Sequence, residues 1–109
     1  MKICVVGAGA IGGFLGTRLA LEGSAAVSAL AQEVAGRGIT VNTVSPGYIG
    51  TDMVRAIKPE RLEKIVAGIP VKRLGTPEEI ASIVAWLASD ESAFATGADF
   101  SLNGGLHMG

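Results

Sequence analysis

The chain has 109 residues, of which 16 are glycine, 49% are hydrophobic and 17% are charged, and its formal net charge is −1. This length fits a single domain with one hydrophobic core. The near-neutral charge excludes the basic surface of a protein that binds nucleic acid or an anionic membrane. The apolar runs are too short to span a bilayer, and we expect no signal peptide. The sequence therefore predicts a cytoplasmic protein.

Hydrophobic periodicity divides the chain into strands and helices. The apolar run 3–6 predicts a buried strand, and a helical pattern over residues 10–35 follows it, interrupted at Gly23-Ser24. The β-branched run 39–44 predicts a second strand that ends in a turn at 45–47. Two short helices follow, one over residues 51–57 and one that begins at residue 59. A longer helix is predicted over residues 76–88, and a last strand over residues 98–102.

The longer helix has the clearest local start signal in the chain. Thr76 is a typical N-cap, Pro77 suits the first helical position, and Glu79 completes a capping box. The order of all these elements predicts an α/β fold, a single small Rossmann-like domain of three layers with a short, mainly parallel sheet of about three strands.

The path of residues 10–38 leaves two arrangements open. A hairpin bend at Gly23-Ser24 makes the strand 39–44 antiparallel to 3–6, whereas one long or kinked helix allows parallel strands with a right-handed crossover. A straight helix over residues 10–35 would be about 39 Å long, against roughly 20 Å for a six-residue strand. A kink, or an exchange of elements between chains, is therefore needed.

The strongest chemical motif is a glycine turn that follows a strand and opens a helix. Gly7 permits the tight turn, Gly9 lets the backbone approach a pyrophosphate, and Gly12 allows the helix to pack closely on the strand. The helix N-terminus at Ala10 and Ile11 offers N–H groups to phosphate oxygens. Such motifs are followed, about 20 residues later and at the end of a second strand, by an acidic residue, or by an arginine that binds the 2′-phosphate of NADP. In this chain that position falls within a predicted helix. We therefore expect weak or vestigial NADP binding.

Four other candidate groups are interpreted as structural. Cys4 is predicted to be a buried, inert thiol, and as the one cysteine it excludes a disulfide framework. His107, the one histidine, has no other histidine or cysteine to share a metal, so no metal site is expected. Trp86 and Phe94 are predicted to be core or subunit contacts.

The first 23 residues, MKICVVGAGAIGGFLGTRLALEG, resemble the N-terminus of ketopantoate reductases (2-dehydropantoate 2-reductases). The resemblance implies NADPH binding at Gly7, Gly9 and Gly12. The catalytic lysine and glutamate of that family lie in a later, all-helical domain, which these 109 residues do not contain.

From Ser24 onward the chain is similar to the C-terminal half of short-chain dehydrogenases/reductases. The segments that carry the similarity are 30–35, 38–49, 51–53, 70–75, 77–81 and 96–99. The ending DFSLNGGLHMG looks most like acetoacetyl-CoA reductases, which are close relatives of the 3-oxoacyl-carrier-protein reductases.

This second resemblance implies roles for four residues of one turn. Pro46, Gly47 and Thr51 would flank the nicotinamide of the cofactor, and Tyr48 would lie near the acyl substrate. The resemblance also implies a homo-oligomer with subunit contacts through the 76–88 helix and the 98–102 strand. Exchanged N-terminal elements are the other route to self-association, and open sheet edges favour it.

The sequence departs from the family at the catalytic residues. The Tyr-x-x-x-Lys pair, in which the tyrosine acts as acid and base, is absent, because Tyr48 is the one tyrosine and Asp52 stands four residues after it. The family's own glycine motif is replaced by one that resembles another family. The junction therefore predicts a chimera, of natural or engineered origin.

Three hypotheses for function follow from these residues. The first is a recombined domain derived from NADP-dependent oxidoreductases, at most a dinucleotide- or phosphate-binding module without a complete catalytic set. The second is a purely structural chimera that binds no ligand. The third is a working acetoacetyl-CoA or 3-oxoacyl reductase.

Overall fold

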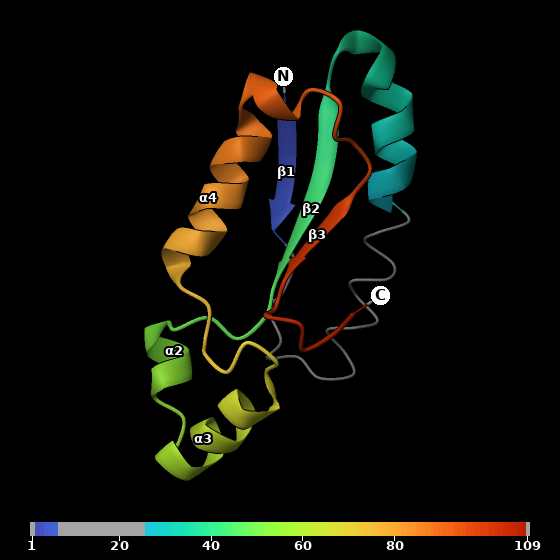
Figure 1. The fold of residues 1–109 in the computed structure, drawn as a ribbon. Helices are drawn as coiled ribbons and strands as arrows, with labels where there is room; N and C mark the ends of the chain where they lie inside the picture. Colours follow the sequence, from blue (N-terminus) through green and yellow to red (C-terminus); the bar gives the residue numbers. More distant parts are fainter. Residues whose placement is uncertain (1, 7–25, 109) are drawn as a thin grey trace.

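The computed structural model describes residues 2–6 and 26–108, the first of these ranges by its backbone alone, and shows a parallel sheet between helices (Figure 1). The sheet has the strand order β1-β2-β3. Its strands are β1 (Lys2–Val6), β2 (Thr40–Pro46) and β3 (Asp99–Leu102). The helices are residues 26–34, the 3-10 helices η1 (Ala35–Arg37) and η2 (Asp90–Ser92), α2 (Asp52–Arg55), α3 (Pro59–Gly68) and α4 (Pro77–Ala88).

Two helices cover opposite faces of the sheet, which gives the three layers expected from the sequence. Figure 1 shows α4 on one side of the strands and residues 26–34 on the other. From the second helix Ala31 is buried, and its Cβ is the nearest atom to a Cβ built on Gly97, just before β3. The predicted α/β fold class is confirmed.

β1 and β2 are parallel neighbours within one chain. Their register runs from Lys2 opposite Thr40 to Val6 opposite Val44. Of the two arrangements that the sequence left open, the structure therefore has the parallel one. The predicted kink at Gly23-Ser24 lies outside the described residues.

The central strand β2 is buried because helices cover both of its faces. Val41 and Val44 have no exposed surface, and Asn42 is 1% exposed. The Asn42 side chain is hydrogen-bonded at both ends, since its Nδ2 donates to the Ala95 carbonyl at 2.9 Å and its Oδ1 accepts from the Ala98 amide at 3.2 Å. This amide therefore fixes the turn that leads into β3.

The aromatic residues are placed differently from one another. Trp86 of α4 is half-buried and meets Phe100 of β3 edge to face, with ring centroids 6.1 Å apart and an interplanar angle of 73°. Phe94 is fully exposed. A core position for Phe94 is therefore wrong within this chain, because the turn after η2 directs it to solvent, and a subunit contact stays a prediction.

Helix ends follow local chemistry. Thr76 and Glu79 form the predicted capping box of α4. α2 ends at Arg55, two residues earlier than predicted. Lys58, before Pro59, has non-helical backbone angles (φ −53°, ψ 137°), because a following proline disfavours the helical region. None of the helices in the described part of the chain is long and apolar enough to cross a membrane.

Candidate functional site

The candidate site lies where the parallel strands end. Pro46 at the end of β2 is paired with Leu102 at the end of β3, and Val6 at the end of β1 is paired with Val44. The chain therefore leaves β1 toward the glycine motif from the same sheet edge at which β2 leads into Gly47. In open α/β sheets this carboxyl edge is where ligands bind.

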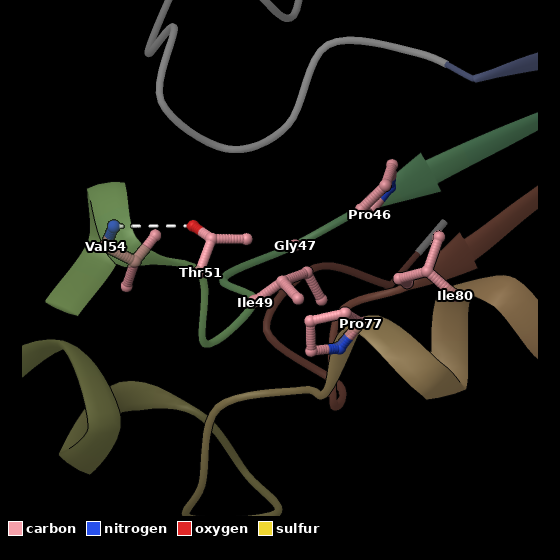
Figure 2. A pocket seen from close by; sticks show the side chains of 7 residues that line it. All are labelled: Pro46, Gly47, Ile49, Thr51, Val54, Pro77 and Ile80. Carbon is pink, nitrogen blue, oxygen red and sulfur yellow. Dashed lines mark hydrogen bonds between the residues drawn. The ribbon is translucent and has the colours of Figure 1, made fainter.

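A cavity of about 330 Å³ opens beside the end of β2, within the usual range of ligand pockets, about 300–1,000 Å³ (Figure 2). Its walls come from the β2 exit, from α2 and from the start of α4. The lining residues are Pro46, Gly47, Ile49, Thr51, Val54, Pro77 and Ile80. Most of these side chains are apolar, so the cavity suits a flat, weakly polar group with a few polar substituents.

Gly47 allows two strand exits to run in contact. Its amide donates to the Leu102 carbonyl at 2.9 Å. A Cβ built on Gly47 would lie 2.7 Å from the Asn103 Cβ and 2.8 Å from the Asn103 Cα. Backbone atoms cannot rotate away, so this position requires glycine.

Thr51 places a hydroxyl at the cavity. It is the N-cap of α2, and its Oγ1 accepts a hydrogen bond from the Val54 amide at 3.4 Å, drawn as a dashed line in Figure 2. A hydroxyl that accepts one bond still has its own proton to donate. Thr51 can therefore donate to a carbonyl oxygen of a ligand in the cavity.

The segment before α4 holds the loop between β2 and α2. The Gly75 amide donates to the Tyr48 carbonyl at 3.0 Å, and the Gly50 amide donates to the Gly75 carbonyl at 2.8 Å. Ile49 and Gly75 form an isolated parallel bridge. This pairing directs the loop from Tyr48 to Gly50 past the cavity.

An ion pair stands beside that bridge. Arg73 donates to Glu79 through two parallel bonds, Nη1 to Oε1 at 2.7 Å and Nη2 to Oε2 at 3.0 Å. The hydrogen bonds from the Arg73 guanidinium, and then the one from the Thr76 amide, lower the pKa of Glu79 to about 2. The same contact raises the pKa of Arg73.

The lowered pKa of Glu79 predicts a pH dependence of stability. A carboxyl whose folded pKa is depressed stabilises the fold above its unfolded pKa, ordinarily 4.5, and loses that contribution as the pH falls toward about 2. The difference in unfolding free energy between wild type and Glu79→Gln is therefore expected to stay constant from about pH 8 to about pH 5 and to shrink below pH 4.5. Urea unfolding of both proteins across this range measures it, and a difference that grows in acid would contradict the assignment.

The structure brings together three of the predicted site residues. Pro46, Gly47 and Thr51 line one cavity. Tyr48 is half-buried and is not among the residues that line it. The predicted phosphate-binding residues Gly7, Gly9, Ala10, Ile11 and Gly12 lie outside the described residues.

Four lining residues were not predicted from the sequence. Ile49, Val54 and Ile80 have the apolar pattern of core residues, and Pro77 was explained by its place at the start of a helix. No local signal marks them as site residues, because only the approach of α4 to the β2 exit brings them to the cavity.

Comparison with known proteins identifies the family of the chain. A family model described as enoyl-(acyl carrier protein) reductase, which belongs to the short-chain dehydrogenases/reductases, matches residues 16–107. The chain belongs to the short-chain dehydrogenase/reductase family. The family match begins eight residues before the boundary that we predicted at Ser24.

Individual short-chain reductases are similar over most of the chain. An acetoacetyl-CoA reductase of Cupriavidus necator is 79% identical over 81 residues, which are 74% of this chain and 33% of that protein. An acetoacetyl-CoA reductase of Shinella zoogloeoides is 63% identical over 79 residues, 71% of this chain and 32% of that protein. A 3-oxoacyl-(acyl-carrier-protein) reductase of Vibrio cholerae is 53% identical over 79 residues, 72% of this chain and 32% of that protein.

Each of these matches covers only part of this chain and only part of the related reductase. The chain spans about a third of the length of these relatives. The resemblance of residues 1–23 to ketopantoate reductases stays a prediction, because the family match covers only residues 16–23 of that segment.

Proposed function

We propose that the β2 exit and the start of α4 form the nicotinamide side of an NADP(H)-dependent reductase site for 3-oxoacyl thioesters, with acetoacetyl-CoA as the favoured substrate. The observation that carries this proposal is that Pro46, Gly47 and Thr51 line one cavity at the carboxyl edge of the sheet. The similarity to acetoacetyl-CoA reductases supports the reductase hypothesis better than the hypothesis of a binding module alone.

The residues at the cavity fit a nicotinamide. Ile49 and Ile80 supply apolar walls for a flat ring, and Gly47 leaves room beside the strand exit. The Thr51 hydroxyl can donate to a carboxamide oxygen. A bound nicotinamide would supply the hydride for reduction of the acyl carbonyl.

The chain's own residues would bind and orient rather than transfer a proton. The apolar walls would shield the reacting face from water, and Thr51 would hold a nicotinamide by its carboxamide. Tyr-x-x-x-Lys does not occur in these 109 residues, so the proton donor for the carbonyl oxygen is not assigned to this chain. The assigned role is therefore to hold the cofactor.

Titration with NADPH tests the cofactor part of this proposal. We expect saturable binding in the millimolar range or tighter, followed by calorimetry or by NADPH fluorescence. Gly9→Asp is expected to weaken binding at least about tenfold, because a carboxylate at this position would repel a pyrophosphate. No saturation at millimolar NADPH, with a cooperative melt that NADPH does not shift, would favour the structural chimera without a ligand.

A graft tests the reductase part. The matched segment of the Cupriavidus necator acetoacetyl-CoA reductase is replaced by the corresponding residues of this chain, and NADPH oxidation with acetoacetyl-CoA is measured. We expect activity within about tenfold of the parent enzyme, because the two segments are 79% identical over 81 residues. A folded graft that binds NADPH without reducing acetoacetyl-CoA would contradict the proposed substrate.

A further inference from the structure

The Arg73–Glu79 ion pair lies outside the cavity of the proposed site but contacts the segment that shapes it. A second cavity, of about 280 Å³, is lined by both residues of the pair. Ile49 and Ile80 line this cavity and also the one at the β2 exit. The ion pair and the proposed cofactor site therefore share a wall.

The bonds of the pair fasten the segment from residue 73 to 76. Besides its two bonds to Glu79, Arg73 donates from Nη1 to the Leu74 carbonyl at 3.1 Å. Glu79 Oε1 also accepts from the Thr76 amide at 2.9 Å. Both ends of the short segment that contains Gly75 are thus tied to α4.

Gly75 transmits this restraint to the loop at the cavity. Its amide and carbonyl are bonded to Tyr48 and Gly50, on either side of Ile49. A Cβ built on Gly75 would lie 2.7 Å from the Ile49 Cδ1, so the two segments are in close contact. Movement of Gly75 must therefore move Ile49 or break these bonds.

We propose that Arg73 and Glu79 are positioning residues that hold the loop from Tyr48 to Thr51 in the shape that receives the nicotinamide. The expected effect on NADPH affinity rests on the proposed function. The restraint on the loop rests only on the hydrogen bonds of Gly75 and of the ion pair. Neither residue of the pair lines the cavity at the β2 exit, and we infer that the pair acts on it through Gly75 and Ile49.

A role in helix capping alone predicts different results. The side chains of Arg73 and Glu79 are 57% and 46% exposed, and exposed ion pairs contribute little to global stability. The capping box needs Glu79 and Thr76 but not Arg73. Arg73→Gln therefore removes the ion pair and leaves the cap, which makes it the decisive variant.

Hydrogen exchange and NADPH titration of the full chain test the proposal. For Arg73→Gln we expect the Gly50 and Gly75 amides to exchange about 3- to 10-fold faster and the Kd for NADPH to rise by a similar factor, while the Tm changes by less than about 3 °C. Arg73→Lys, which keeps the charge but not the two parallel bonds, is expected to lie between Arg73→Gln and wild type. Arg61→Gln on the exposed face of α3 is the matched control with the same loss of charge.

The outcomes separate this proposal from the proposed function. Exchange rates of Gly50 and Gly75 that are the same in Arg73→Gln and Arg61→Gln overturn the positioning role, whatever happens to the Tm. Faster exchange of these amides in a chain that does not bind NADPH upholds the restraint on the loop and rejects the proposed cofactor site. Faster exchange with an unchanged Kd overturns the link between the loop and binding.

Discussion

Replacing Gly47 with alanine is expected to raise the Kd for NADPH at least about tenfold and to destabilise the fold by about 1–3 kcal/mol. The added methyl group would lie 2.8 Å from the Asn103 Cα, so the exits of β2 and β3 must move apart. That movement strains the bond from the Gly47 amide to the Leu102 carbonyl and displaces Pro46 and Thr51 from their shared cavity.

Gly68→Ala provides the matched control for this experiment. Gly68 is the last residue of α3, and a Cβ built there meets no atom within 4 Å. Because alanine is favoured over glycine in helices, stability is expected to be unchanged or slightly higher, with NADPH binding unaffected. Urea unfolding followed by the fluorescence of Trp86, the one tryptophan, gives both stabilities. Equal behaviour of the two variants would show that Gly47 and Asn103 are not in close contact.

Replacing Asn42 with aspartate is expected to cost about 3–5 kcal/mol of stability at neutral pH. The change keeps the shape of a side chain that is 1% exposed but removes the donor that bonds the Ala95 carbonyl at 2.9 Å. An ionised carboxylate would then face the carbonyl oxygen of Ala95 at a position that is almost inaccessible to solvent. The Ala98 amide, at 3.2 Å, would be its one retained partner among the Asn42 bonds described above.

The cost of Asn42→Asp is expected to depend on pH with a definite sign. Burial raises the pKa of the introduced carboxyl above its unfolded value of about 3.9, so the folded state binds the proton more tightly than the unfolded state does. Relative to wild type, the variant is therefore most stable at low pH, where the protonated group can donate to the Ala95 carbonyl. It loses stability as the pH rises through the folded pKa.

Asn42→Ala separates the charge from the lost hydrogen bonds. It leaves the Ala95 carbonyl and the Ala98 amide without their side-chain partner, at a cost of about 1–3 kcal/mol, and it introduces no titratable group. Unfolding free energies are measured at about pH 4.5 and about pH 7.5 for both variants. A cost of Asn42→Asp that is the same at both pH values would contradict a buried carboxylate at this position.

Elements whose structure depends on neighbouring residues could be predicted from the sequence. The cap formed by Thr76 and Glu79 was predictable because its partners are three residues apart. The end of β2 was placed less well, because the strand was predicted to stop at residue 44 and it continues to Pro46. The early end of α2 at Arg55 was not predicted, and Pro59 does not explain it, since a proline restricts only the residue directly before it. The exposure of Phe94 could not be predicted, because a single aromatic residue in a turn has no periodic pattern that shows which way it points.

The site could be predicted only in part, for a similar reason. Pro46, Gly47 and Thr51 lie within six residues and carry a resemblance that implies a nicotinamide site. Ile49 and Ile80, by contrast, belong to segments that are far apart along the chain and meet only in the fold. No sequence pattern indicates that the ion pair of Arg73 with Glu79 could restrain Ile49. The proposed restraint passes through the backbone of Gly75, which a pattern of side chains does not show.

The sequence by itself determined the α/β class, the capping box of α4 and the approximate positions of the three strands. Hydrophobic periodicity and helix capping act between residues that are near neighbours in the chain, so a short segment is enough to show them. Only the tertiary structure decided that β1 and β2 are parallel and that α4 approaches the β2 exit. These outcomes depend on pairings across tens of residues, whose free energy comes from burying β2 on both faces. Glycines illustrate both cases. A sequence pattern indicates Gly7, Gly9 and Gly12, whereas the structure adds why residue 47 must be glycine, which is its close approach to Asn103.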